Sequence, residues 1–310
     1  MAYSQGGLIA ASDYNNFLNG SNQLNTVWST GTGDTGYGQT ALSTVATSGT
    51  VTATQWATLI NTLNNALTHQ QGSGSGLGAP TTGATIAYLS SLSGSINTAY
   101  TNRLNHTSQG STQTGSVYSP NPTAANNTTY GQSTVLQRVI TFSSGDAARY
   151  FFNAGGYFNF VITSVSNNNG TSRSADAATL IGTGLNGVSG FRAHANNGLT
   201  GSGASVQTNN TSFGYYNLTG SNVITHQVQS TSGTYNNTVA YVYFGSNGTN
   251  VSGNGDAGSV INVYLNFTDG HNNYAGGFND TLNITVNHRI DIVYPESTYI
   301  GNSWGTVTVS

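Results

Sequence analysis

The chain has no cysteine and no lysine, and it is poor in charge of either sign. Without cysteine it forms neither a disulfide framework nor a cysteine-based metal site, and the redox compartment stays open. Only 5% of the 310 residues are charged, against roughly a quarter in ordinary soluble domains. A surface of neutral amides and hydroxyls suits a protein that is packed against neighbours or works outside the cell. A Thr/Asn-rich extracellular adhesin is the alternative interpretation.

The charges that are present do not favour nucleic acid as a partner. The six basic residues are all arginine, and with nine acidic residues they give a net charge of −3. The sequence contains no basic run, and phosphate affinity needs clustered Lys or Arg. We therefore expect no nucleic-acid-binding groove.

Long apolar runs are also missing. The start of the chain, "MAYSQGGLIAAS", has no basic leader, and no segment of about 18 apolar residues follows it. We therefore expect neither Sec-type export nor membrane insertion, and no membrane partner. A composition of extracellular type without an export signal fits a protein that is released by cell lysis.

The first third of the chain has the periodicity of helices. Residues 52–55, "TATQ", have the form of a capping box, and apolar residues follow on one face, which predicts a helix over 53–69. Apolar residues at three- and four-residue steps predict a second helix over 83–105, and Ser12 is placed to cap a short helix over 12–18. The two longer helices predict a helical hairpin. Its outer faces are rich in poor helix formers, so burial must supply its stability.

Beyond residue 106 the pattern changes. Residues 107–133 hold a proline pair and almost no aliphatic residues, so they predict an extended connector. Glycine-rich stretches at 182–187 and 196–205 predict long surface loops. Seven other segments are rich in β-branched and aromatic residues and predict strands: "TVLQRVITF", "YFNFVITSV", "VITHQVQS", "TVAYVYFGS", "SVINVYLNFT", "TLNITVNHRIDIVY" and "WGTVTVS".

These patterns predict an α+β chain. A helical N-terminal docking region over residues 1–106 contains the helical hairpin, and the connector over 107–133 leads to an antiparallel all-β sandwich over 134–310. In the longest predicted strand the apolar residues keep one parity on both sides of His288, which places them on one face.

The stretch "RYFFNAGGYFNF", residues 149–160, gathers aromatic residues around a glycine pair. We predict that Gly155 and Gly156 form a two-residue hairpin turn, because primed turns require positive φ. A ligand cradle is the weaker alternative, since no Lys or Ser/Thr of a phosphate loop accompanies the pair. Such a hairpin has aromatics on both faces, so a second layer or subunit must cover one of them. We therefore predict an interface between copies of the chain, formed by Trp56, Leu59, Leu63, Leu89, Ile96, Tyr150, Phe151, Phe152, Tyr157, Phe158 and Phe160.

Candidate sites for chemistry are few. The loop "FTDGHNNYAGGFND" brings Asp269, His271 and Asp280 near asparagines and is rich in the oxygen ligands of Ca²⁺, but a solvated hairpin loop is the favoured interpretation. The loop "GTNVSGNGDAG" contains one acidic residue, Asp256, and its Gly and Asn residues are typical of a turn.

No catalytic pattern is present. The histidines at 194, 226, 271 and 288 are dispersed without an HExxH motif, and no G-x-S-x-G elbow follows a strand. We predict that the protein is not an enzyme and has no catalytic residue, no cofactor and no metal ligand.

Tyrosine is abundant, with 18 residues. Exposed tyrosine beside Asn and Ser forms adaptable recognition surfaces and sugar-stacking platforms, so a glycan-binding face is the second hypothesis. Filling of strands is the more common role of tyrosine. The numerous N-x-S/T sequons arise readily by chance in this composition and say little about glycosylation.

Four phrases together resemble virion structural proteins of tailed bacteriophages, notably T4-like and cyanobacterial phages: "GGLIAASDYNNFLNG", "GYGQ", "VTATQWATLINTLNNALTHQQG" and "ARYFFNAGGYFNF". The resemblance covers most of residues 6–160 and implies a virion part, in the tail, neck or baseplate region, that acts by packing against other proteins. It implies no catalytic residues. Expected partners are copies of the chain, in a homo-oligomer such as a trimer, and other virion proteins. The alternatives are a carbohydrate-binding receptor module of a phage fibre, with a host surface glycan as partner, and a capsid decoration protein. The expected location is the virion, assembled in the host cytoplasm and released by lysis.

Overall fold

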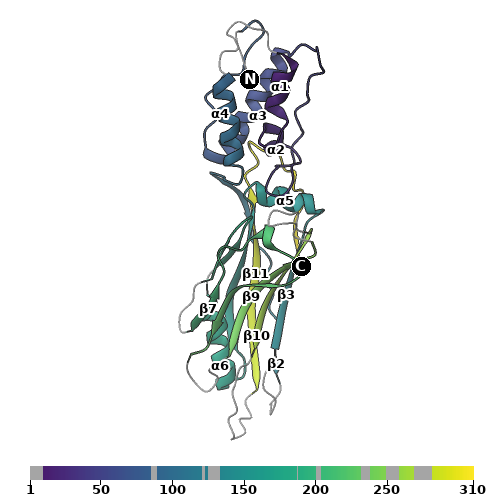
Figure 1. Cartoon of the computed structure of the whole chain (residues 1–310). Helices are drawn as coiled ribbons and strands as arrows, with labels where there is room; N and C mark the ends of the chain where they lie inside the picture. Colours follow the sequence, from purple (N-terminus) through teal and green to yellow (C-terminus); the bar gives the residue numbers. More distant parts are fainter. Residues whose placement is uncertain are drawn as a thin grey trace.

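The molecule is elongated, with the N-terminal helices gathered at one end and a β-sandwich at the other (Figure 1). The computed structural model describes residues 10–84, 89–120, 123–124, 133–186, 188–199, 204–231, 238–248, 258–268 and 281–310. Its fold class is α+β, with two antiparallel sheets that pack against each other, as the sequence predicts.

The helical end contains α1 (Ala11–Leu18), α2 (Leu24–Trp28), α3 (Ala53–Gln71) and α4 (Leu89–Thr101). The capping box of α3 is confirmed, because the Thr52 hydroxyl accepts from the Gln55 N–H and the Gln55 side chain accepts from the Thr52 N–H. The helices enclose their own apolar core, in which Trp56 packs against the rings of Tyr14 and Phe17 at 5.9 Å each. α4 is shorter than predicted and ends at Thr101.

The start of α1 differs in detail from the prediction. The helix begins at Ala11, and the Asp13 carboxylate accepts from the Ala10 N–H at 3.1 Å. Ser12 therefore lies inside the first turn and is not the cap. The acidic residue satisfies a free backbone donor in its place.

The first sheet has the order β1-β11-β4-β5-β6, and β2 also pairs with β11. Its strands are β1 (Gln109–Gln113), β2 (Thr123–Ala124), β4 (Tyr157–Asn167), β5 (Val188–Phe191), β6 (Asn196–Asn197) and β11 (Leu282–Pro295). β1 and β2 come from the segment predicted as a connector, and their pairing with β11 makes that segment an edge of the sheet.

The second sheet has the order β12-β3-β10-β9-β8-β7. Its strands are β3 (Ser133–Thr141), β7 (Ser205–Asn209), β8 (Val223–Gln229), β9 (Val239–Ser246), β10 (Val260–Thr268) and β12 (Thr308–Val309). All seven segments that the sequence predicts as strands contain one. Phe191 of the first sheet stacks on Phe244 of the second at 4.6 Å, which places the sandwich core between the sheets.

β4 carries a bulge opposite the middle of β11. Asn287 pairs with Ser164 and His288 with Ile162, so Thr163 of β4 is the extra residue. β11 has no extra residue at this point, and Ile284, Val286, His288 and Ile290 are all buried, so the predicted apolar parity is confirmed.

The prediction of a hairpin at the glycine pair is wrong. The aromatic residues before it form a helix, α5 (Gly145–Asn153), which lies at the waist of the molecule where the two ends meet (Figure 1). The Ser144 hydroxyl caps α5 by accepting from the Ala147 N–H. Gly155, at φ 92°, ends the helix and turns the chain into β4. Aromatic content suggested a strand, but the Ser144 cap favours a helix, and residues 147–153 are all buried in it.

Part of the predicted surface loops is also helical. α6 (Ser172–Thr179) runs into a π-helix, η1 (Leu180–Gly184), so two of the predicted loop glycines lie in helical backbone. A 3-10 turn, η2 (Tyr215–Asn217), packs near α5. The hydroxyl of Thr171 caps α6, and Leu180 and Ile181 are buried, which is why this segment folds onto the sandwich.

Candidate functional site

The structure places most of the predicted interface residues inside the chain's own core. Tyr157 is only half-buried, and the side chain of Leu89 lies outside the described residues. The other nine are buried: Trp56, Leu59, Leu63, Ile96, Tyr150, Phe151, Phe152, Phe158 and Phe160. Trp56, Leu59, Leu63 and Ile96 lie in the core of the helical end. The hairpin with two apolar faces does not exist, and the aromatic rings assigned to it join α5 to the sandwich; Phe151, for example, stacks on Phe158 at 5.1 Å.

The waist of the molecule is built on residues 29–39, which we call the junction loop. Four glycines of this loop have positive φ: Gly31, Gly33, Gly36 and Gly38. A Cβ on Gly36 would come within 2.6 Å of the Ser29 carbonyl oxygen, so the loop folds back tightly on itself. This turns several of its backbone carbonyl oxygens toward α5.

Arg149 of α5 fills the space inside the junction loop. Its side chain is 2% exposed, and its Nη1 donates to the carbonyl oxygens of Thr30 at 2.5 Å and Thr35 at 2.8 Å. Its Nη2 donates to Asp146 at 2.8 Å. A guanidinium carries five N–H donors in a fixed fork, so one buried arginine satisfies several carbonyl oxygens at once.

Asn153, one turn further along α5, extends the same network. Its amide nitrogen lies within hydrogen-bonding distance of the carbonyl oxygens of Gly33, Thr35 and Gly36. Its amide oxygen accepts from the Tyr216 hydroxyl of η2. The side chain thus joins the junction loop to the sandwich.

A second set of contacts links the junction loop to α3 and to the segment after α4. The Tyr37 hydroxyl donates to the Arg103 carbonyl oxygen at 2.7 Å and accepts from Gln70 at 2.8 Å. Arg103 forms an ion pair with Asp34 at 2.5 Å. Burial raises the pKa of Tyr37, so this hydroxyl keeps its proton at every ordinary pH. The helical end and the sandwich are therefore joined by specific polar contacts on both sides of the waist.

Histidines also collect at the waist. His69 of α3 faces Glu296, which follows β11, with 3.7 Å between Nδ1 and Oε2, and His194 lies 3.8 Å from Asp34. Burial lowers the pKa of both histidines, although each acidic neighbour opposes the shift. Both rings are therefore neutral at pH 7.

A small cavity of about 190 Å³ opens beside the glycine pair. Gly155 and Gly156 line it together with His106, Arg192 and His194. The pair therefore turns the chain, and it also borders a cavity that the sequence did not indicate.

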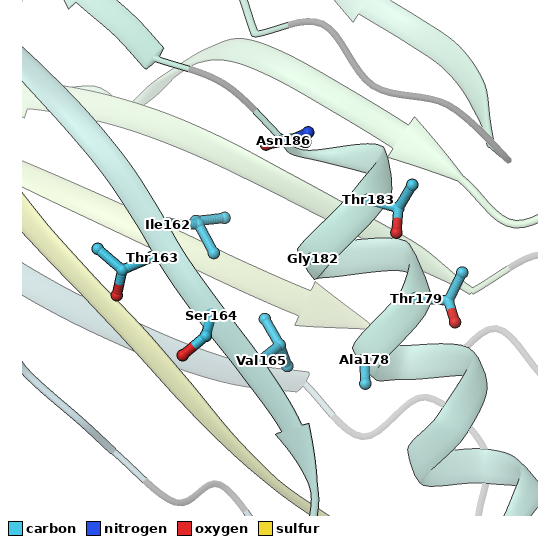
Figure 2. A pocket seen from close by; sticks show the side chains of 9 residues that line it. All are labelled: Ile162, Thr163, Ser164, Val165, Ala178, Thr179, Gly182, Thr183 and Asn186. Carbon is cyan, nitrogen blue, oxygen red and sulfur yellow. The ribbon is translucent and has the colours of Figure 1, made fainter.

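A wider groove of about 450 Å³ lies between β4 and the α6–η1 helix (Figure 2). Ile162 and Val165 lie between the strand and the helix, whereas Thr179 and Thr183 project from the far side of the helix. The side chain of Ser164 is already bonded to Asn287 at 2.7 Å. The lining carries no charged side chain, and it combines aliphatic side chains with the hydroxyl and amide groups of Thr163, Ser164, Thr179, Thr183 and Asn186.

The outer face of the second sheet gathers tyrosines. Tyr243 of β9 stacks on Tyr264 of β10, with ring centroids 4.6 Å apart, and Tyr241 lies 5.5 Å from Tyr243. Residues directly opposite one another in a sheet share a face, so the pairing gives the outward set, which we call the tyrosine face. It comprises Val135, Gln137, Val139, Ile224, Gln227, Tyr241, Tyr243, Asn262, Tyr264 and Asn266, none of them charged.

The calcium and turn hypotheses lie outside the described residues, because 249–257 and 269–280 are not among them. Of the remaining predicted histidines, His226 and His288 are buried in the sandwich and His194 lies at the waist. Within the described ranges, no three His, Asp or Glu side chains come together as metal ligands. Each helix in those ranges is too short or too polar to traverse a bilayer.

Sequence reasoning missed Arg149, Asn153 and the junction loop. A signal was present in "GTGDTGYG", whose closely spaced glycines indicate a strained loop, and in an arginine inside an aromatic run. No protein-family model matches the chain, and no curated protein or solved structure shows significant similarity to it.

Proposed function

We propose that the chain is a structural component of a tailed-phage virion that packs through the tyrosine face against copies of itself. The observation that carries the proposal is the composition of that face. It combines stacked tyrosine rings with amide and aliphatic side chains and has no charge. Interface cores are enriched in tyrosine and depleted in charged residues.

Exposed apolar side chains continue the face toward one edge of the sheet. Val135, which pairs with Asn266, is 47% exposed. Tyr243 and Tyr264 are each half-buried, so their outer edges and hydroxyls meet solvent in the isolated chain. A second sheet that covered this face would remove apolar surface from water without desolvating a charge.

The architecture suits a rigid part of a larger particle. The helical end and the sandwich have separate cores, and the buried contacts of Arg149 and Asn153 join them at the waist. The N-terminal helices serve as the docking region, and the tyrosine face is the lateral contact. A low net charge favours assembly, because self-repulsion between copies is small.

Light scattering coupled to size exclusion tests the packing. The purified full chain should have a mass above that of the monomer, and the double variant Tyr243→Ser, Tyr264→Ser should return it to a monomer with an unchanged circular dichroism spectrum. Tyr299→Ser is the matched control, because Tyr299 is 40% exposed and follows β11, outside the tyrosine face. A wild-type monomer at all concentrations would contradict the packing.

The virion role has its own test. An antibody against the purified chain should label intact particles of the source phage at one fixed position in electron micrographs. Labelling of lysate protein alone, with unlabelled particles, would refute the role even if the chain oligomerises.

The same face supports a second candidate function, binding of a neutral host glycan. Gln137 donates to Asn262 at 3.0 Å on this face, and such amides beside tyrosine rings are the groups that bind sugar hydroxyls. A monomeric chain whose Tyr241 and Tyr243 signals shift with neutral oligosaccharides would favour this function over packing.

A further inference from the structure

The cavity beside the glycine pair combines an apolar wall with a cation. Leu104, Phe152, Ala193 and Ala195 supply carbon surface, and Arg192 reaches the same space. The cavity volume of about 190 Å³ is below the roughly 300–1,000 Å³ of pockets that hold drug-sized ligands, so the cavity suits a small molecule.

Arg192 differs from the arginines that form ion pairs. Arg103, Arg149 and Arg289 pair with Asp34, Asp146 and Asp291. In the described part of the chain no such acidic partner holds Arg192, and its guanidinium lies over the Tyr157 ring at 3.8 Å from the centroid. A guanidinium on a ring face keeps its N–H edges free for a planar oxygen pair.

The histidines that line the cavity, His106 and His194, add no charge to it. Nδ1 of His106 is buried and has no hydrogen-bond partner among the described residues. Burial and, next, the charge of Arg192 lower the pKa of His106, so its ring is neutral at pH 7. A neutral imidazole has one N–H to donate. The permanent cation of the site is therefore Arg192.

Gly155 leaves room for the His106 ring at this cavity. A Cβ at position 155 would come within 2.6 Å of the His106 Cγ and Nδ1 atoms. Only glycine lets the ring lie this close to the backbone at a φ of 92°. The glycine pair thus shapes the site as well as the turn.

We propose that this cavity binds a small monocarboxylate with a compact apolar body. The carboxylate lies against the guanidinium of Arg192, within reach of a histidine N–H, and the apolar body lies on Phe152 and the alanines. Arginine can donate two parallel N–H hydrogen bonds to a carboxylate, so both charge attraction and the geometry of the pair favour binding. The apolar wall disfavours a bare inorganic anion, which would lose hydration there without compensation. This site does not depend on the proposed virion role.

The test uses the full chain and three probes that separate charge from shape. Benzoate carries both features, benzamide has the same shape without the charge, and inorganic phosphate has charge without the apolar body. Binding is measured by calorimetry and by NMR shifts of the Gly155 and Gly156 amides. We expect benzoate to bind and to shift both amides. Benzamide, which loses the charge-assisted pair, and phosphate, which lacks the apolar body, should each bind about tenfold weaker or worse.

Variants locate the site. Arg192→Gln should weaken benzoate binding by about tenfold, whereas Arg192→Lys, which keeps the charge, should weaken it less. Arg289→Gln, which removes an arginine already paired with Asp291, should leave benzoate affinity unchanged.

Four outcomes would overturn the proposal. Three concern the wild-type chain: that benzoate does not bind, that it binds no more tightly than benzamide does, or that it binds no more tightly than phosphate does. The last is that a folded Arg192→Gln variant binds benzoate with unchanged affinity. If Arg192→Gln fails to fold, the comparison of benzoate with benzamide on the wild type and on Arg192→Lys decides the matter.

Discussion

Arg149 and Asn153 donate to the same backbone oxygen: the carbonyl of Thr35 lies 2.8 Å from Nη1 of the arginine and 3.1 Å from Nδ2 of the asparagine. The two donors lie one turn apart on one face of α5, and the acceptor belongs to the junction loop, more than a hundred residues away in sequence. Buried carbonyl oxygens must be paired, so the junction loop and α5 require each other.

Arg149→Met should destabilise the chain by about 2–4 kcal/mol, because the Thr30 carbonyl oxygen loses the arginine as a buried donor and the Thr35 carbonyl oxygen keeps only Asn153, while the aliphatic stem is kept. Urea unfolding measures the change. Arg289→Met is the control; its side chain is 27% exposed, against 2% for Arg149, and pairs with Asp291, so its loss should cost less than the loss of Arg149. Equal costs for the two variants would show that the buried contacts of Arg149 add nothing.

Asn153→Asp should cost about 3 kcal/mol or more at pH 7, because a carboxylate has no N–H and would face three carbonyl oxygens. Asn105→Asp, at an exposed position, should change stability by less than about 0.5 kcal/mol. A double-mutant cycle with Arg149→Met should give a coupling energy above about 0.5 kcal/mol, since both side chains share one acceptor. Strict additivity would mean that the two donors act independently.

The strands of the sandwich were predictable because their signal is local. Alternating β-branched and aromatic residues between Asn/Gly turns identify β8, β9, β10 and β11 without knowledge of their partners. The capping box of α3 is local in the same way. The bulge in β4 was not predictable, because it depends on register with β11.

The waist was not predictable, because its contacts join segments far apart in sequence. The aromatic run over 149–153 has high strand propensity, and its tertiary contacts with the junction loop and the sandwich override that propensity. Most of the predicted interface residues lie inside the chain, since burial within one chain and burial between chains give the same sequence pattern. The tyrosine face could be anticipated only as an excess of tyrosine, because its rings come together through strand pairing.

Gly155→Ala should destabilise the chain more than Gly170→Ala does. Both glycines have positive φ, at 92° and 71°, so both variants carry the cost of that backbone conformation, about 1 kcal/mol or more. A Cβ at 170 meets nothing within 4 Å, whereas at 155 it meets the His106 ring at 2.6 Å. Thermal unfolding of the two variants isolates the cost of that contact. Equal losses would mean that the His106 ring moves aside freely.

The stability of the chain should fall as the pH is lowered from 6.5 toward 4. Burial lowers the pKa of His288 from 6.5 to about 4, and Arg138 adds to the shift. Between pH 6.5 and pH 4 this histidine binds a proton in the unfolded chain but stays neutral in the folded chain, so a lower pH favours unfolding. The contribution is fully present above pH 6.5 and is lost as the pH falls through this window, to a total of about 3 kcal/mol at about 1.4 kcal/mol per unit.

His288→Phe should flatten this pH dependence. The His288 ring lies between Tyr118 at 5.4 Å and Phe160 at 5.6 Å, so a phenyl ring keeps the packing and removes the titration. Urea midpoints at pH 7 and pH 4.5 should differ less in the variant than in the wild type. The pKa values of His69, His106, His194 and His226 are also lowered by burial, so a smaller slope of the same sign should remain. Identical slopes in both proteins would show that His288 is already protonated in the folded chain.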